Sequence, residues 1–199
     1  MRRLLNIFMP ISNATSPQTS TAKAQAPGFS TPEFRASLAM FATGVTIVTA
    51  RTAAGELIGL TANSFNSVSL SPPLVLWSLS QAASSMAAFS AGSHYAINIL
   101  ATDQQDWAER FASKRVDRWE GVAFTDGVAG APLLAGAAAS FECFNRSRYV
   151  EGDHVIFVGE VERCSTAKAL HRCCTTAAGF IPSTHFRTRY LKPSMPCSR

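Results

Sequence analysis

Between residues 45 and 163 the apolar residues fall into short runs, and each run is bounded by turn-forming residues. The run Val45-Thr46-Ile47-Val48-Thr49 is β-branched throughout, which favours a strand. Short strands that follow one another through tight turns pair as antiparallel hairpins. The expected strands are 45–49, 57–65, 74–79, 95–100, 137–149 and 154–163. Only two of the intervals between them carry a helix pattern, so the chain is expected to form a mainly β, antiparallel barrel with short helices.

The helix signals are local and short. Ser30-Thr31-Pro32-Glu33 is a capping box that predicts a helix over 31–42, ended by Gly44. Ser84 or Ser85 begins a second helix that continues to Ala91, and a third opens at 102–105 and ends near residue 112. The sequence has neither a G-x-G-x-x-G fingerprint nor a P-loop, so a classical dinucleotide or nucleoside-triphosphate site is not supported.

Composition excludes several other classes of protein. Hydrophobic residues make up 47% of the 199 residues, enough for a packed core, and no apolar run reaches the ~18 residues of a membrane span. The five cysteines are an odd number without a C-x-x-C pair, which indicates reduced thiols and a cytoplasmic protein rather than a disulfide scaffold. We expect no metal site.

The net charge of +5 comes from the two ends of the chain. Residues 1–32 hold three basic groups and no acid, and residues 164–199 hold six basic groups and no acid. The segment between them holds nine basic and thirteen acidic groups. Basic ends could bind polyanions, so nucleic-acid binding stays an alternative, but the centre has no recognition motif and we expect no specific nucleic-acid partner. We expect a disordered N-terminal extension over 1–30, a folded domain over 31–164 and a divergent basic tail over 165–199.

An uncharged polar segment lies between Gly59 and Pro73. Its hydroxyl and amide side chains suit a flat heteroaromatic ring with polar edges, although they could equally satisfy the backbone of an ordinary loop. Ser84 and Ser85 at a helix start suit a phosphate or a simple N-cap. Arg110 and Lys114 at the end of the third helix could reach a phosphate or complement the helix C-terminus.

The sequence shows no acid–base machinery. His154 follows a Gly-Asp turn, and a lone histidine is more often structural than catalytic. We find no Ser/His/Asp order, no H-E-x-x-H and no paired carboxylates on one helical face. A cofactor that carries the chemistry itself would fit this absence.

Several motifs occur together in a fixed order. They are Phe41-Ala42-Thr43-Gly44-Val45-Thr46, Gly59-Leu60-Thr61-Ala62-Asn63-Ser64-Phe65, Ser67-Val68-Ser69-Leu70 with Pro72-Pro73, Ser84-Ser85, Ala96-Ile97-Asn98-Ile99-Leu100, Arg110-Phe111-Ala112, Pro132-Leu133-Leu134 and Gly152-Asp153-His154. Each motif is weak, but the ordered set over residues 33–163 resembles the flavin reductase family, the reductase components of two-component flavin monooxygenases.

The resemblance implies an FMN-binding split β-barrel that is a homodimer. Such enzymes pass a hydride from NADH or NADPH to FMN (or FAD), and the reduced flavin diffuses to a separate oxygenase. The resemblance places His154 beside the nicotinamide and Ser84 and Ser85 at the flavin phosphate. The other cofactor-binding positions that it implies are Thr43, Gly44, Val45, Thr46, Thr61, Ala62, Asn63, Ser64, Phe65, Ser67 and Phe111.

The match to the family fails after Cys164, where we expect either a shifted reading frame or a divergent C-terminus. Two other functions stay open beside the reductase. One is a flavin-binding electron carrier without turnover. The other is an enzyme of the pyridoxamine-phosphate oxidase type, which would need a basic cluster for its substrate, and 33–163 offers only Arg110, Lys114, Arg115 and Arg118.

Overall fold

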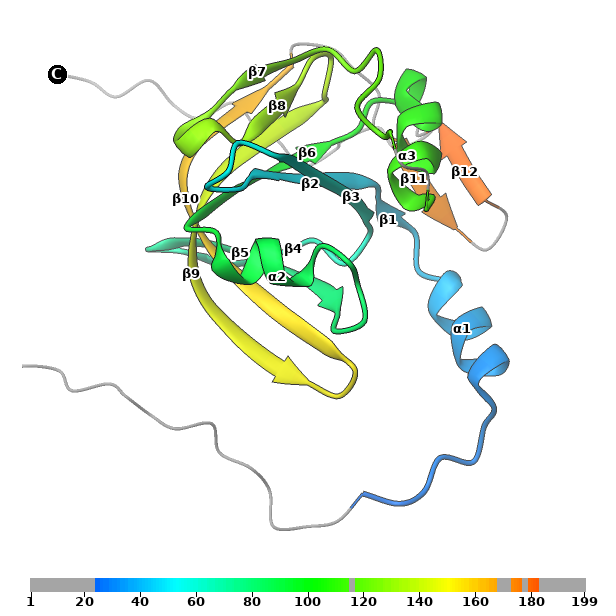
Figure 1. Ribbon diagram of the computed structural model, residues 1–199. Helices are drawn as coiled ribbons and strands as arrows, with labels where there is room; N and C mark the ends of the chain where they lie inside the picture. Colours follow the sequence, from blue (N-terminus) through cyan, green and yellow to red (C-terminus); the bar gives the residue numbers. More distant parts are fainter. Residues whose placement is uncertain (1–23, 115–116, 168–172, 177–178, 183–199) are drawn as a thin grey trace, which may run out of the picture.

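The computed structural model describes residues 24–114, 117–167, 173–176 and 179–182. One antiparallel sheet of seven strands, in the order β3-β2-β6-β9-β10-β5-β4, curves around the core (Figure 1). The prediction of a mainly β, antiparallel fold with short helices is confirmed. The strands of this sheet are β2 (Thr46–Arg51), β3 (Leu57–Ala62), β4 (Asn66–Leu70), β5 (Pro73–Ser80), β6 (His94–Ile99), β9 (Ala139–Glu151) and β10 (His154–Thr166).

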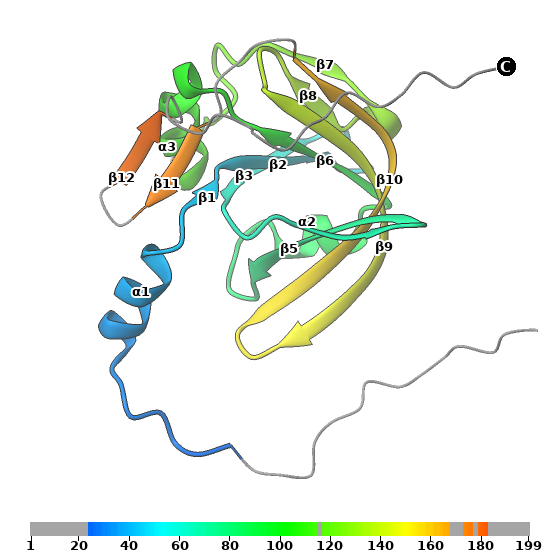
Figure 2. The ribbon, with the colours of Figure 1, turned by 180° about the vertical axis from the view of Figure 1, so that it is seen from behind.

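The remaining elements are short. Two small sheets pair β7 with β8, and β1 with β11 and β12. Seen from behind, β11 and β12 lie beside β1 (Figure 2). These elements are α1 (Thr31–Ala39), β1 (Thr43–Gly44), α2 (Met86–Ala91), η1 (Thr102–Gln104), α3 (Gln105–Ala112), β7 (Phe124–Asp126), η2 (Val128–Gly130), β8 (Pro132–Leu134), β11 (Cys173–Thr176) and β12 (Gly179–Pro182).

The core follows from the alternation of side chains along the strands. In β5 the side chains of Val75, Trp77 and Leu79 are buried, and the residues between them face outward. Trp77 stacks on Phe157 with ring centroids 4.8 Å apart and meets Phe89 edge to face at 5.0 Å. A second apolar cluster lies under α3. Its buried members are Val45, Ile47, Leu100, Ala108, Phe111, Val122 and Leu134.

A pair of hydrogen bonds joins the residue after edge strand β3 to strand β5, the neighbour of the other edge strand. Ser64, just after β3, donates its hydroxyl to the carbonyl of Ser78 on β5 at 3.2 Å. The same oxygen accepts the Ser78 amide at 2.9 Å. The C-terminal end of edge strand β3 is therefore fastened to β5. Toward the other end of β3 the two strands enclose a space.

Asn98 fixes the β7–β8 hairpin to the main sheet from inside. Its side chain is fully buried and donates to the carbonyls of Ile47 at 3.2 Å and Pro132 at 3.3 Å. Its oxygen accepts the Leu134 amide at 3.0 Å and the Ser140 hydroxyl at 3.1 Å. This one amide side chain therefore joins β2, β6, β8 and β9.

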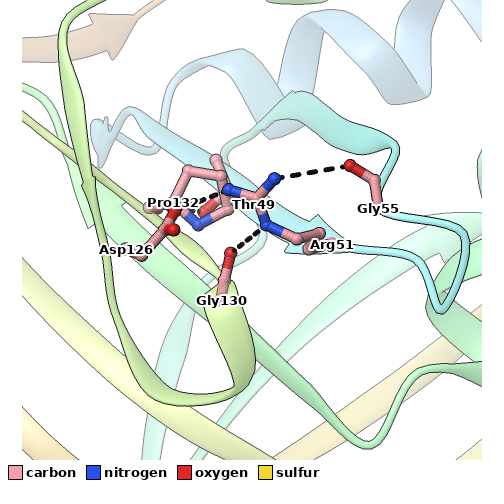
Figure 3. Close-up of polar contacts among 6 residues, drawn as sticks. All are labelled: Thr49, Arg51, Gly55, Asp126, Gly130 and Pro132. Carbon is pink, nitrogen blue, oxygen red and sulfur yellow. Dashed lines mark hydrogen bonds and ion pairs between the residues drawn. The ribbon is translucent and has the colours of Figure 1, made fainter.

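Arg51 holds the same hairpin from its outer side (Figure 3). Its guanidinium donates to the Gly130 carbonyl at 3.0 Å and forms an ion pair with Asp126 at 2.6 Å. Two residues earlier, on the same face of β2, Thr49 donates its hydroxyl to the Pro132 carbonyl at 2.6 Å. The hairpin is thus attached at several points to β2, which supports the cluster under α3.

The elements differ from the sequence expectations in several places. The strand expected over 57–65 ends at residue 62, and the polar stretch 66–70 forms the edge strand β4. An edge strand has one unpaired side in water, so polar residues are tolerated there and the period-two pattern is weak. Between the end of the third expected helix and the strand expected from residue 137, where no strand was predicted, the structure has β7 and β8. The capping box of α1 is present as predicted, but that helix ends at Ala39.

The segment expected to be a basic tail contributes backbone to the fold. Strands β11 and β12 lie at 173–176 and 179–182, and β11 pairs with Thr43–Gly44. The boundary expected at residue 164 stays a prediction. The expected N-terminal extension falls largely on residues 1–23, outside the described residues. Across the part of the chain that the structure describes, no helix has the length and apolar character needed to cross a membrane.

Candidate cofactor groove

A cavity of about 810 Å³ lies along the open edge of β3. One wall is β3 itself, the second is the connection from β5 to α2, and the third is the end of α3 with the segment that follows it. The lining residues are Glu56, Leu57, Ile58, Gly59, Leu60, Thr61, Leu79, Ala82, Ala83, Ser84, Ser85, Phe111, Ala112, Lys114, Arg118 and Trp119. We call this cavity the groove.

Two side chains bond the open edge of β3. The indole N–H of Trp119 donates to the Leu57 carbonyl at 3.1 Å, and the guanidinium of Arg118 donates to the Gly59 carbonyl at 3.1 Å. In an antiparallel strand every second residue directs its N–H and C=O to the same side. The next residue with this orientation is Thr61, which lines the groove. The backbone of Thr61 therefore offers a donor and an acceptor to a ligand.

The aromatic wall of the groove depends on Gly59 having no side chain. A Cβ atom at Gly59 would lie 2.5 Å from Cε1 and 2.8 Å from Cδ1 of Phe111, and 3.0 Å from Cζ2 of Trp119. The ring of Phe111 is only 1% exposed and meets Trp119 edge to face, with centroids 5.0 Å apart. The backbone of β3 and these two rings are thus packed in direct contact.

The lining of the groove also includes the hydroxyl side chains of Ser84 and Ser85 and the charged side chains of Glu56, Lys114 and Arg118. Ser84 and Ser85 lie just before α2, and the side chain of Ser85 makes no capping hydrogen bond to that helix. Lys114 lines the groove from the other side and is exposed. Hydroxyl groups facing an ammonium group suit a phosphate.

Four of the predicted cofactor positions come together in this groove: Thr61, Ser84, Ser85 and Phe111. The hydroxyl of Thr61 donates to the Ala108 carbonyl at 2.6 Å, so this side chain anchors α3 while its backbone faces the groove. Phe111 is almost fully buried, so it backs the wall more than it faces the groove.

The other predicted positions lie around the groove and not in its lining. Val45 is buried in the cluster beneath α3, and Thr46 donates its hydroxyl to the carbonyl of buried Ala62 at 2.7 Å. Asn63 is an exposed turn residue, and Ser67 lies exposed on β4. Two further predicted positions make internal contacts. Ser64 hydrogen-bonds Ser78, and the ring of Phe65 packs on Phe141 with ring centroids 5.4 Å apart.

Thr43 and Gly44 form β1, at the junction with the small sheet. The hydroxyl oxygen of Thr43 is buried and has no hydrogen-bond partner among the described residues. A buried hydroxyl without a partner is costly, so it is available to a ligand.

His154 lies at the start of β10, opposite Ser80 of β5. Residues paired across a sheet point to the same face, so His154 points away from the face on which Leu79 lines the groove. Its Nδ1 lies 2.7 Å from the Asp153 carboxylate, and this hydrogen bond lowers the pKa of Asp153. The side chain of His154 is 46% exposed.

Sequence reasoning missed Gly59, Arg118 and Trp119 as parts of one wall. A single glycine inside an expected strand signals a close approach of another chain segment, and Gly59 is such a residue. Nothing comparable marked Trp119, because its position depends on the path of the chain after α3. Of the cations considered for phosphate, Lys114 lies in the groove, whereas Arg110 bonds the carbonyl of Glu120.

The residues present fit a planar heteroaromatic ligand with a phosphate. The Trp119 wall suits the ring, the Thr61 backbone suits the ring's polar edge, and Ser84, Ser85 and Lys114 suit the phosphate. Among the residues that the structure describes, no group of three or more His, Cys, Asp or Glu side chains is arranged to hold a metal ion.

Two named bacterial proteins are similar to this chain in sequence. The FMN reductase (NADH) SmoA of Agrobacterium fabrum is 44% identical over 143 residues, which is 69% of this chain and 78% of that protein. The reductase component of the flavin-dependent trigonelline monooxygenase of Acinetobacter baylyi is 37% identical over 162 residues, covering 81% of this chain and 49% of that protein. This chain therefore spans about half the length of that relative.

A solved structure of a flavin oxidoreductase is also similar to this chain. The NADH:FAD oxidoreductase SgcE6 of Streptomyces globisporus, in complex with NAD and FAD fragments, superposes with a TM-score of 0.73 at 37% identity. The alignment covers 80% of this chain and 94% of SgcE6. In addition, residues 38–192 match the family described as the flavin reductase like domain, a match that continues beyond Cys164. With its curved antiparallel sheet and a groove suited to a phosphorylated ring, the chain belongs to the flavin reductase-like family.

Proposed function

We propose that this chain is a flavin reductase that transfers a hydride from NADH or NADPH to FMN or FAD and releases the reduced flavin to a separate oxygenase. The observation that carries the proposal is the groove itself, in which an aromatic wall and a strand edge face two hydroxyls and an ammonium group. The named relatives support it, since they include an FMN reductase (NADH) and an NADH:FAD oxidoreductase.

When bound, the nicotinamide donates the hydride and the flavin ring accepts it. The chain's own contribution is to bind and orient the two molecules. The backbone of Thr61 and of the turn that follows it hydrogen-bonds the polar edge of the ring, and Thr43 to Thr46 support that turn from β1 and β2. Ser84, Ser85 and Lys114 hold the phosphate. We assign His154 to the side of the nicotinamide on the resemblance to the family; it is exposed at the start of β10, where it pairs with Ser80 at the end of β5, on the sheet face opposite to that of Leu79.

The first test is oxidation of NADH and of NADPH by the purified chain, followed by the loss of nicotinamide absorbance, with and without added FMN, FAD or riboflavin. Flavin-dependent turnover is expected. Tightly bound flavin with negligible turnover would instead support the electron carrier. Absence of both binding and turnover would refute the proposed function.

Lys114→Ala tests the phosphate end of the groove. Removal of the ammonium group should raise the Kd for FMN about tenfold, the size of one charge-assisted hydrogen bond, and leave the Kd for riboflavin unchanged. Riboflavin is the matched control because it lacks only the phosphate. Equal weakening of the two ligands would contradict this assignment.

His154→Ala tests the nicotinamide side. The KM for NADH should rise while the Kd for FMN stays at the wild-type value. Asp153→Asn is the matched control, since it removes the charge that neighbours His154 and leaves the imidazole in place. An unchanged KM in His154→Ala would remove this residue from the site.

The alternative of the pyridoxamine-phosphate oxidase type is less well supported. It needs several free cations around a substrate phosphate. Of the cations considered, Arg118 bonds the Gly59 carbonyl and Arg110 bonds the Glu120 carbonyl, so both serve the fold.

We further propose that two copies form a homodimer through the outer face of β5, β10 and β9. This face carries half-buried Leu74, Leu76, Ile156 and Val158 next to exposed Phe144 and Tyr149. Its charges are paired, as in the ion pair of Arg146 and Glu160 at 2.8 Å. In an isologous interface the same surface of the two copies meets. A surface with charges of both signs and rows of apolar side chains can therefore pair with itself, whereas a surface with charges of one sign only would repel its copy.

Sedimentation velocity tests the homodimer. Val158→Arg, in the middle of this face, should give a monomer, and Thr125→Arg, at an exposed position on β7, should leave the dimer intact. A wild-type monomer would refute the proposal.

We also propose a cytoplasmic location, which fits the free thiols of Cys143 and Cys164.

A further inference from the structure

Trp119 is the aromatic side chain best placed to contact a ligand in the groove. Phe111 lines the same wall but is 1% exposed, whereas Trp119 is half-buried and keeps part of its ring accessible. The third aromatic ring of this group, Phe124, meets Trp119 edge to face at 5.4 Å from behind. A ligand ring in the groove therefore meets the indole before it meets Phe111.

The orientation of this indole is fixed from three directions. Its N–H donates to the Leu57 carbonyl, and its ring edge is held by Phe111 and Phe124. The residue before it, Arg118, is bonded to Gly59, two positions further along the same strand edge. Two successive side chains are therefore attached to alternate carbonyls of β3, so the indole cannot rotate without breaking a hydrogen bond.

The position of Trp119 along β3 relates it to the polar edge of a ligand. Trp119 and Arg118 occupy the outward carbonyls of Leu57 and Gly59, and the next outward backbone groups belong to Thr61. A planar ligand bonded to Thr61 would extend along the strand edge toward Gly59, where Arg118 is bonded and where Cζ2 of the indole lies 3.0 Å from the position of an added Cβ atom. The spacing of alternate residues along a strand is about 6.6 Å, which matches the width of a fused ring system.

We propose that Trp119 is the ring against which the flavin ring system packs, and that Arg118 is a positioning residue that holds it there. The inference rests on the proposed function, because it concerns how the same groove binds flavin. It assigns the aromatic contact to a residue that the sequence motifs did not single out, and it gives Arg118 a role other than phosphate binding.

The test is the Kd for riboflavin and for FMN, measured by quenching of flavin fluorescence. Trp119→Leu keeps the bulk of the side chain and removes the ring, and should raise both Kd values about tenfold, as stacking energies for ring ligands indicate. Trp119→Phe restores a ring and should restore most of the affinity. Trp107→Leu is the matched control, since Trp107 packs on the same apolar cluster and is not among the described residues of the groove lining.

Urea unfolding of each apo variant identifies any loss of fold and keeps it separate from a loss of binding. Unchanged riboflavin affinity in a folded Trp119→Leu variant would overturn the proposal, as would an equal loss in Trp107→Leu. A rise in the KM for NADH alone would overturn it too, because the indole would then contact the nicotinamide. If the wild-type chain binds no flavin, the proposed function fails before this question arises.

Arg118→Met separates positioning from phosphate binding. A positioning role predicts that the Kd values for riboflavin and FMN rise by the same factor, smaller than in Trp119→Leu. Weakening of FMN alone would show that the guanidinium binds the phosphate and would overturn this part of the proposal.

Discussion

Replacing Gly59 by alanine tests whether the groove wall is as tightly packed as the structure shows. The added Cβ would lie 2.5 Å and 2.8 Å from two ring carbons of Phe111, closer than two carbon atoms approach in folded proteins. The Phe111 ring is 1% exposed and belongs to the buried cluster under α3, so moving it would disturb the packing of that cluster. Either the ring or strand β3 must shift.

The size of the effect follows from two opposing terms. Overpacking of a well-packed core costs about 1–3 kcal/mol. Alanine in place of glycine inside a strand gains about 0.5–1 kcal/mol from the smaller entropy of the unfolded chain. Since the two closest contacts at Gly59 are both to one confined ring, we expect a net loss of about 1–2 kcal/mol in the free energy of unfolding.

Urea unfolding with linear extrapolation measures this change. Gly44→Ala is the control for the backbone term, because a Cβ there meets nothing within 4 Å. It should leave stability unchanged or raise it slightly.

A double-mutant cycle with Phe111→Leu identifies the cause. If the clash is with the Phe111 ring, Gly59→Ala should cost at least about 1 kcal/mol less in the Phe111→Leu background than in the wild type. The same cost in both backgrounds, or a Gly59→Ala variant as stable as the wild type, would refute the reasoning.

Three further outcomes follow from buried polar groups. Asn98→Ala leaves the buried Leu134 amide without its acceptor, and should lower the free energy of unfolding, measured in urea, by about 3 kcal/mol or more. Ser140→Ala removes a single hydrogen bond of the same network and should cost about 1 kcal/mol. Thr61→Val has nearly the same shape but cannot donate to the Ala108 carbonyl, and should cost about 1 kcal/mol in the same measurement; no change would show that α3 does not depend on this bond. Burial raises the pKa of the Cys143 thiol to about 12, so at pH values near 8 it stays protonated, and peptide mass spectrometry of the native chain treated with iodoacetamide should find Cys143 unmodified and exposed Cys164 labelled.

The strands were predictable because the signal for each is local. The β-branched run at the start of β2 reflects a strand that is buried on both faces, and the alternation of Val75, Trp77 and Leu79 in β5 reflects burial of every second side chain. Strand β4 was not predicted, since a polar strand at a sheet edge has the composition of a loop. The same limit applies to β7, which is three residues long and is held in place by distant groups such as Arg51.

The residues of the candidate site also fall into those that local sequence signals could predict and those that depend on distant contacts. Ser84 and Ser85 were found because a helix start is visible in the sequence, and Thr61 because the polar segment around it is unusual. Trp119 was not found, because its contact with Leu57 joins residues 62 positions apart and depends on how the chain leaves α3. The cofactor role that the resemblance implies for Ser64 stays a prediction, and the structure adds that its hydroxyl fastens the end of β3 to β5.

The sequence by itself determined the class of fold, the short helices and the order of motifs that relates the chain to flavin reductases, because periodicity, capping and turn residues act over a few neighbouring positions. The tertiary structure alone decided which of those residues share a cavity. Register places His154 on the sheet face opposite to that of Leu79, and the return of the chain after α3 brings Trp119 and Arg118 to the edge of β3. Both depend on long-range pairing, which cooperative packing of the whole chain selects and no local pattern encodes.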